Sequence, residues 1–399
     1  MSEEKDPFLF DDCFGILETI QPKNGMATKN ELEDLLTFLG GFEKWPLLNE
    51  DCRREVVKYL DYKTRFNLGI CSKNDQETVE KTKIYVESVG IEDTERLHYL
   101  INKEEFDNVT VRIQFPNGNS IERFFSQLEQ DTRVQWLHYV PKQRPVVKEV
   151  IWKSCSYYEE AVKFAEKWMK KSNFELNAIT VEMANYPFAI SQVKSLPCCK
   201  KVRIRANTVD SFDWWLKKCP EQLDDLQLAV HSEDRELFTL PSGSLNAPQI
   251  LQVSKFYFWC RAAFSDEQLL KLEAKSMHFN SVDVTDKGIN KFIRNWVYGK
   301  AVNGFKDLHL WASTVRDPDV MMAGLDEVKE WDEAFENEKW GFVEDFKRCC
   351  GRGRCYQIKS KVAPFESLTL SIHEDRVSIY ATGKRAEHNG ETYTYYRIP

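Results

Sequence analysis

The sequence predicts a mixed α/β fold, in which a small three-helix module precedes an irregular strand-helix repeat domain ending in antiparallel strands. Three observations support this prediction. Residues 45–83 hold three short segments with apolar residues at helical spacing, too few to bury a stable core of their own. From about residue 84, short β-branched or aromatic runs alternate with amphipathic segments. Near the C-terminus, strand-like runs follow one another directly.

Composition and charge narrow the class of protein. The chain has 399 residues, 42% apolar and 13% aromatic, values typical of a globular protein. Its net charge of −8 argues against a nucleic-acid partner, because nucleic-acid binders are usually basic. Residues 1–44 carry 10 Asp/Glu against 4 Lys/Arg, so we expect residues 1–40 to form an acidic N-terminal extension.

The N-terminus and the hydropathy of the chain indicate where the protein resides. Residues 1–6 are acidic where a secretion signal is basic, and no run approaches the roughly 18 apolar residues that span a bilayer. We therefore expect a cytoplasmic or nuclear protein that does not associate with membranes. The 11 cysteines are scattered, and in a reducing compartment they are expected to be free thiols.

The N-terminal module is expected to contain three helices. Asn49 can cap the first helix, because its side chain can accept from a free backbone N–H. The apolar positions of that helix share one face, namely Cys52, Val56, Tyr59 and Leu60. Asp61 can cap a second helix, which carries Phe66 and Ile70 four residues apart, and a third helix is expected over 74–79.

The order and spacing of these segments resemble the F-box, in the form expanded in nematodes. The resemblance rests on a Trp-Pro-Leu opening at 45–47, a Val-Val-x-x-Leu helix at 56–60 and a Cys-Ser-Lys ending at 71–73. It implies that residues 41–83 are a module that binds a Skp-family adaptor and, through it, a cullin. The alternative is a three-helix packing unit that belongs to the main domain.

The resemblance also implies which side chains face the adaptor. A Pro-Leu opening offers a rigid apolar knob, and a helical apolar stripe can fill a groove. The adaptor-binding residues implied in this way are Pro46, Leu47, Leu48, Val56, Val57, Tyr59 and Leu60.

The larger part of the chain, residues 84–399, reads as strands that alternate with helices. Strand candidates lie at 84–86, 109–113, 150–152, 179–181, 202–204, 226–228, 256–258, 277–279 and 308–310. From the fourth candidate onward their spacing is close to that of leucine-rich-repeat solenoids. Helix caps are expected at Ser156, Thr208, Ser265 and Thr285. Because the regular Asn/Cys ladder of such repeats is missing, an ordinary α/β domain remains an alternative.

Two amphipathic stripes and a C-terminal segment complete the prediction for this domain. The stripes are Ala161, Phe164, Ala165 and Trp168, and Ile289, Phe292, Ile293 and Trp296. Residues 284–308 resemble the F-box-associated domain, with a capped helix that ends in Trp-aliphatic-x-Gly before a leucine strand. The closing runs at 368–370, 377–380 and 393–398 are expected to be antiparallel, with a turn at Asn389-Gly390.

No signature of an enzyme, a metal site or a cofactor is evident in the sequence. Gly-x-Ser-x-Gly, P-loop, Rossmann and His-Glu-x-x-His motifs are missing. The seven histidines never pair at metal-ligand spacing, and His278 and His309 are expected to be wall residues of a sheet. Cys349, Cys350 and Cys355 lack a nearby fourth ligand, so we expect free thiols in a loop. The prediction is therefore no catalytic site, no metal and no cofactor.

Two surface features could contact other molecules. The segment 347–361 holds six basic residues and no acidic one, so we expect a solvated loop or, alternatively, an anion-binding patch. Phe258 and Trp259 are adjacent in a predicted strand and must point to opposite faces, so one of them is a candidate contact for a target. Trp214 and Trp215 are expected to be half in the core.

Together these features predict a substrate-recognition subunit of a Skp-cullin-F-box type ubiquitin ligase, which recruits an unknown protein target and performs no bond chemistry itself. Two alternatives remain open. One is an adaptor-binding scaffold without a degradative role, and the other is an α/β enzyme with an unrecognised site.

Overall fold

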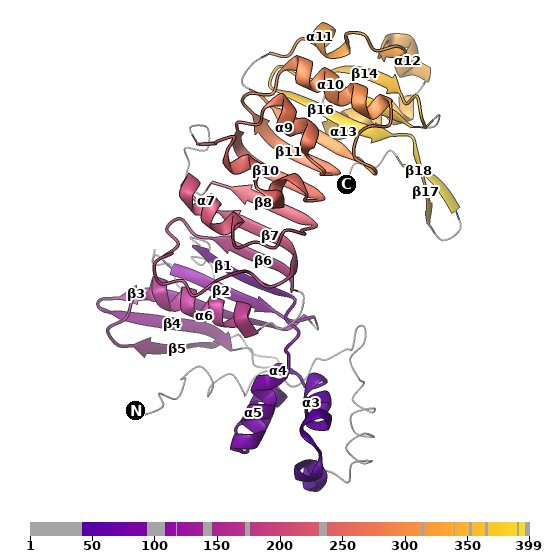
Figure 1. Ribbon diagram of the computed structural model, residues 1–399. Helices are drawn as coiled ribbons and strands as arrows, with labels where there is room; N and C mark the ends of the chain where they lie inside the picture. Colours follow the sequence, from indigo (N-terminus) through magenta and orange to yellow (C-terminus); the bar gives the residue numbers. More distant parts are fainter. Residues whose placement is uncertain are drawn as a thin grey trace. The chain divides into compact units, whose positions relative to one another are not determined.

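The chain forms helices at its N-terminal side and then strand-rich sheets, which confirms the mixed α/β prediction (Figure 1). The computed structural model describes residues 42–93, 108–116, 118–138, 146–171, 176–230, 238–312, 315–338, 340–350, 353–363, 366–388 and 391–395. The expected acidic extension lies outside the described residues. Within the described ranges, every helix is too short or too polar to span a bilayer.

The described part of the chain divides into two compact units. One unit runs up to Glu182 and includes Pro187–Cys199, and the other comprises Met183–Tyr186 and the chain from Lys200 onward. The helical module lies in the first unit together with the first six strands. The two units are described separately below.

The helical module contains a 3-10 helix and three α-helices, η2 (Phe42–Leu47), α3 (Glu50–Lys58), α4 (Tyr62–Gly69) and α5 (Lys73–Lys81). The predicted caps at Asn49 and Asp61 are confirmed, since each side chain accepts a backbone N–H three residues on. The third helix begins one residue earlier than predicted, because Ser72 caps it by accepting the N–H of Asp75.

The core of this module is small. Trp45, Val57 and Leu68 are buried together, and Leu48, Val56, Leu60 and Val79 pack against them while remaining partly buried. The indole Nε1 of Trp45 donates to the buried carboxylate of Asp75 at 2.6 Å, so the chain entering the module is tied to α5. So few buried side chains stabilise a fold only marginally, and further contacts are needed.

The strands of the first unit, here called the first sheet, lie in the order β6-β1-β2-β3-β4-β5. Its strands are β1 (Ser88–Asp93), β2 (Asn108–Gln114), β3 (Ser120–Leu128), β4 (Asp131–His138), β5 (Val146–Trp152) and β6 (Leu176–Glu182). Strands β1 and β6 are parallel, and β1 to β5 form an antiparallel meander. Helix α6 (Tyr157–Lys171) packs on β1, β2 and β3 and buries its predicted stripe.

The sequence prediction was wrong in part of this region. The expected strand at 84–86 is not a strand, and β1 begins at Ser88. Strands β3 and β4 were not predicted, because charged side chains such as Arg123 and Arg133 interrupt their apolar alternation. The strand-helix repeat therefore does not begin at residue 84, since the antiparallel meander comes first.

Three aromatic rings join the helical module to the first sheet. Tyr62 begins α4, Phe115 follows β2, and Trp168 lies on α6. The ring of Tyr62 lies 5.9 Å from that of Phe115 and 5.1 Å from that of Trp168, measured between centroids. Phe115 and Trp168 meet edge to face at 5.9 Å. Such pairs add to simple area burial, so this cluster holds α4 against the sheet.

The second unit begins with the predicted strand-helix alternation. Its elements are β7 (Cys199–Arg205), α7 (Val209–Leu216), β8 (Asp225–Ala229), β9 (Thr239–Leu240), η4 (Ser244–Asn246), α8 (Pro248–Leu251), β10 (Lys255–Ala262), α9 (Asp266–Lys271), β11 (Ser276–Ser281), α10 (Asp286–Val297) and β12 (Asp307–Trp311). Strands β7, β8, β10, β11 and β12 pair in parallel in that order. The caps at Thr208, Ser265 and Thr285 are confirmed.

The second unit ends in antiparallel strands, as predicted. Beyond β12 the order is β16-β15-β14-β13. The elements are α11 (Pro318–Met322), β13 (Val328–Glu330), α12 (Glu333–Glu338), α13 (Trp340–Cys350), β14 (Arg354–Lys359), β15 (Ser367–Ile372) and β16 (Arg376–Thr382). Strands β17 (Lys384–His388) and β18 (Glu391–Tyr395) pair separately. The expected turn at 389–390 lies outside the described residues.

The prediction that residues 347–361 form a solvated basic loop is wrong. The segment contains the end of α13 and all of β14. Three of its basic side chains form ion pairs with acids distant in sequence, namely Lys347 with Glu336, Arg354 with Glu330, and Lys361 with Glu327. The run looked uncompensated in the sequence because its partners precede it by 11 to 34 residues.

Gly288 is required by the contact between α9 and α10. The carboxylate of Asp266 accepts from both the backbone N–H and the hydroxyl of Thr285, at 2.8 and 2.7 Å. A Cβ at position 288 would overlap that carboxylate.

We expect Gly288→Ala to lower the free energy of unfolding by about 1–3 kcal/mol, because the added methyl must displace Asp266. Thermal unfolding of the purified chain measures this loss. The matched control is Gly341→Ala in α13, where an added Cβ meets nothing within 4 Å. That change should be neutral or slightly stabilising. Equal unfolding temperatures for the two variants would contradict the assigned role of Gly288.

Candidate docking surface

Three of the seven predicted adaptor-facing residues are exposed on the helical module. Pro46 and Leu47 lie at the end of η2, and Tyr59 is the C-terminal cap residue of α3. The side chain of Leu47 is 82% exposed and that of Tyr59 is 51% exposed. Large apolar side chains with this much exposure are candidate contacts for a partner, as was expected of these three from the sequence.

The remaining four residues take part in the small core. Leu48, Val56 and Leu60 are half-buried and pack against Trp45, Val57 and Leu68. Val57 is fully buried, so its side chain supports the surface from beneath and offers no area to a partner. Sequence spacing could not separate these roles, because on a helix of nine residues the core stripe and the contact stripe overlap.

One exposed apolar residue of this module was missed. Ile70 caps the C-terminus of α4 and is 62% exposed. The sequence predicted a second helix that carries Phe66 and Ile70 four residues apart. In the structure Phe66 is half-buried. Helix α4 ends before Ile70, and the side chain of Ile70 is exposed to solvent. Ser72, a residue type that favours the N-cap of a helix, follows two residues later and was the available signal that α4 ends there.

Arg65 organises the module from within. It is buried, and its guanidinium donates to four backbone carbonyls. Nε donates to Leu60 O at 3.0 Å and Nη2 to Lys58 O at 3.1 Å, which closes the end of α3. Nη1 donates to Thr82 O at 3.3 Å and Lys83 O at 2.7 Å, which fixes the chain after α5.

Burial lowers the pKa of Arg65 to about 10, opposed by the nearby charge of Asp61. The side chain is therefore still protonated at neutral pH, and all of its donors are available. A planar guanidinium suits this position because it presents several N–H groups in a fixed fork. Without Arg65, four backbone carbonyls would lose their hydrogen-bond donor in a site that α3, α4 and the chain after α5 enclose.

Ion pairs lie on the same module. Arg54 pairs with Asp51, Lys58 with Glu55, and Lys81 with Glu50. All of these side chains are more than one third exposed, so each pair contributes little to stability. Charged side chains of this kind are typical of the rim of a protein–protein contact.

The second unit exposes aromatic side chains on the sheet face opposite α9 and α10. Phe258 is fully buried, whereas its neighbour Trp259 is 51% exposed, which confirms that the pair points to opposite faces. Trp259 stacks on Tyr257 at 6.4 Å and lies 6.1 Å from Trp311 on β12, between ring centroids. On α7, Trp215 is buried and Trp214 half-buried, as predicted.

The cysteine cluster is only partly described. Cys355 lies in β14 and is buried, and burial raises the pKa of its thiol. Of the side chains of Cys349 and Cys350 the structure describes nothing. All of the cysteines whose environment is described, Cys355 included, are free thiols as expected.

Comparison with known proteins agrees with this geometry. Residues 45–87 match the F-box domain family. An uncharacterized F-box protein of Caenorhabditis elegans is 42% identical over 381 residues, which cover 95% of this chain and 98% of the relative. No solved structure matches the chain.

Proposed function

Because this chain belongs to the F-box proteins, we propose that it is the substrate-recognition subunit of a Skp-cullin-F-box type ubiquitin ligase. An F-box domain implies an adaptor role in such a ligase, since F-box domains bind Skp-family proteins. The observation that carries the proposal is the exposure of the apolar side chains Pro46, Leu47 and Tyr59, at the two ends of α3, on a module whose own small core is formed by other residues.

The mechanism is proximity. The module binds the Skp-family adaptor and through it the cullin, while the rest of the chain holds a protein target. Holding the target beside the ubiquitin carrier raises the effective concentration of its lysines without any new chemistry. F-box proteins are generally substrate adaptors and not enzymes, and this division of labour needs no catalytic group in the chain.

For the target-binding surface we propose the aromatic face around Trp259 in the second unit. Tyr257, Trp259 and Trp311 are large side chains at least partly open to solvent, and such aromatics anchor protein interfaces. The resemblance of residues 284–308 to an F-box-associated domain supports the same assignment. In this proposal the residues after the module, 84–399, form the target-recruiting part of the chain.

The test is a reconstituted ubiquitin-transfer assay with the full chain, a Skp-family adaptor, a cullin and the ubiquitin-charging enzymes. Proteins that co-purify with the chain should become ubiquitinated, and Trp259→Ala should reduce this by about tenfold or more. The matched control is Trp340→Ala, since Trp340 is 67% exposed on α13. Adaptor binding without ubiquitin transfer to any bound protein would instead favour the scaffold alternative.

A further inference from the structure

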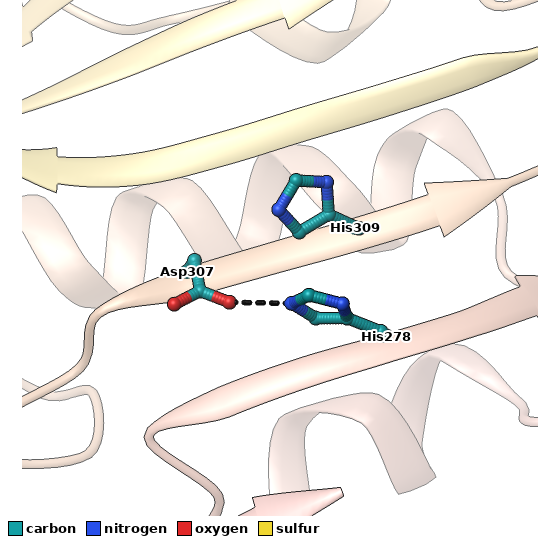
Figure 2. A group of neighbouring side chains, drawn as sticks. All are labelled: His278, Asp307 and His309. Carbon is teal, nitrogen blue, oxygen red and sulfur yellow. Dashed lines mark hydrogen bonds and ion pairs between the residues drawn. The ribbon is translucent and has the colours of Figure 1, made fainter. Parts of the chain in front are cut away.

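Two histidines that lie 31 residues apart in the sequence meet in the second unit. Strands β11 and β12 pair in parallel, and their register places His278 directly opposite His309. Asp307 precedes His309 by two residues on β12, so its side chain points to the same face of the sheet. This is the face opposite α9 and α10, and Figure 2 shows the three side chains converging.

The donor atoms of these side chains lie close together. Nε2 of His278 is 2.7 Å from Oδ1 of Asp307, and the two imidazole centroids are 4.2 Å apart. One donor atom from each of the three residues lies within 4.8 Å of the others. No other group of three or more such side chains among the described residues is arranged in this way.

Two serines hold the cluster in place. Ser276 donates to Oδ1 of Asp307 at 2.7 Å. Ser378, on β16, contacts Nδ1 of His309 at 3.0 Å, which leaves Nε2 of His309 for another ligand. The contact of Ser378 is of the kind found in metal sites, where an outer hydrogen bond to the second nitrogen of a ligating histidine fixes the orientation of the ring.

Aromatic rings surround the cluster and restrict its side chains. Tyr257 packs edge-on against His278 at 4.7 Å, and Tyr380 packs edge-on against His309 at 5.0 Å, between centroids. Trp311 lies 6.2 Å from His309 and stacks on it. Because these rings limit rotation, the two imidazoles are held near one another before any ion arrives, which lowers the entropy cost of binding.

We propose that His278, Asp307 and His309 bind one divalent transition-metal ion, with Zn²⁺ as the preferred ion. Two imidazoles and one carboxylate favour zinc-like ions over Mg²⁺ and Ca²⁺, which prefer all-oxygen sites. With metal–ligand distances of about 2.0–2.2 Å, the separation of Nε2 and Oδ1 widens from 2.7 Å to about 3.3 Å in a tetrahedral site. Three protein donors leave a position for water.

Zinc titration of the full chain by calorimetry, after removal of metals with a chelator, tests this site. We expect one Zn²⁺ per chain. Asp307→Asn and His309→Gln should each weaken binding by more than about 100-fold, and Ser378→Ala by about tenfold, since it removes only an outer contact. The matched control is His373→Gln, because His373 is also half-buried and hydrogen-bonds a serine, Ser371, outside the cluster.

Two further readouts identify the ligands of the bound ion. Substitution with Co²⁺ distinguishes sulfur from nitrogen and oxygen, since only thiolate ligation adds intense near-ultraviolet bands. Those bands should be missing, which excludes binding by cysteines. Zn²⁺ should raise the unfolding temperature of the wild type and of His373→Gln, and leave that of Asp307→Asn unchanged. Equal zinc affinity in the wild type, Asp307→Asn and His309→Gln would overturn the proposal and leave an ordinary His–Asp pair.

Discussion

The double substitution Leu47→Asp and Tyr59→Asp should weaken binding of a Skp-family adaptor by at least about 100-fold. Truncating a central apolar contact costs about 2 kcal/mol or more, and here each change also places a charge in an apolar interface. Both side chains are exposed in the free chain, so the fold should not change. Co-purification and calorimetry with the adaptor measure the loss.

Leu47 and Tyr59 are the positions to change because neither belongs to the core of the module. Asp at Leu48 or Leu60 would also disturb the core of the module, because both pack against Trp45, Val57 and Leu68. Lost binding in such variants could then reflect unfolding. At Leu47 and Tyr59 the surface is changed while that core is kept.

A matched control is Val315→Asp, since Val315 is 78% exposed in the second unit. It introduces the same charge on a comparably exposed apolar side chain outside the module. Its adaptor affinity should equal that of the wild type. Should the double variant retain full affinity as well, the docking surface must lie elsewhere on the chain.

Arg65→Met should destabilise the helical module by at least about 3 kcal/mol. The change leaves four carbonyl groups without the guanidinium that they share, and each unsatisfied buried acceptor costs about 1–3 kcal/mol. Hydrogen exchange should therefore accelerate for the amides of α3, α4 and α5, while the amides of the second unit keep their protection. Adaptor binding should fall together with this protection.

Two further variants show which property of Arg65 is responsible for the effect of Arg65→Met. Arg65→Lys keeps the charge but loses the planar fork, so we expect intermediate protection. Arg54→Met removes an exposed arginine side chain of the same module, paired with Asp51, and should change little. If Arg65→Met left amide exchange in the module unaltered, the hydrogen bonds of Arg65 would not be what holds these helices together.

Features set by short-range patterns were predictable from the sequence. The caps at Asn49, Asp61 and Thr285 depend on residues three positions away, and the structure contains all three. The parallel strands of the second unit followed from runs such as Leu308-His309-Leu310, whose alternate residues are buried.

Features that depend on long-range pairing were not predictable. The pairing of His278 with His309 depends on the register between β11 and β12, and no spacing within one segment encodes a register. In the same way, Arg65 stands in a helix with a weakly amphipathic pattern, and its acceptors lie up to 18 residues away. On α3, the half-buried Val56 and the fully buried Val57 are neighbours in the sequence.

The contact of Tyr62 with Phe115 and Trp168 has a consequence for ubiquitin transfer. If the helical module rotated freely relative to the rest of the chain, the ubiquitin carrier could reach many lysines of a bound cargo protein. Instead, these aromatic rings hold the helical module against the first sheet, and only residues 82–87 join α5 to β1. Any part of a cargo that also contacted the first sheet would therefore keep one orientation toward the carrier, so its lysines in a narrow zone should be modified repeatedly while others are spared.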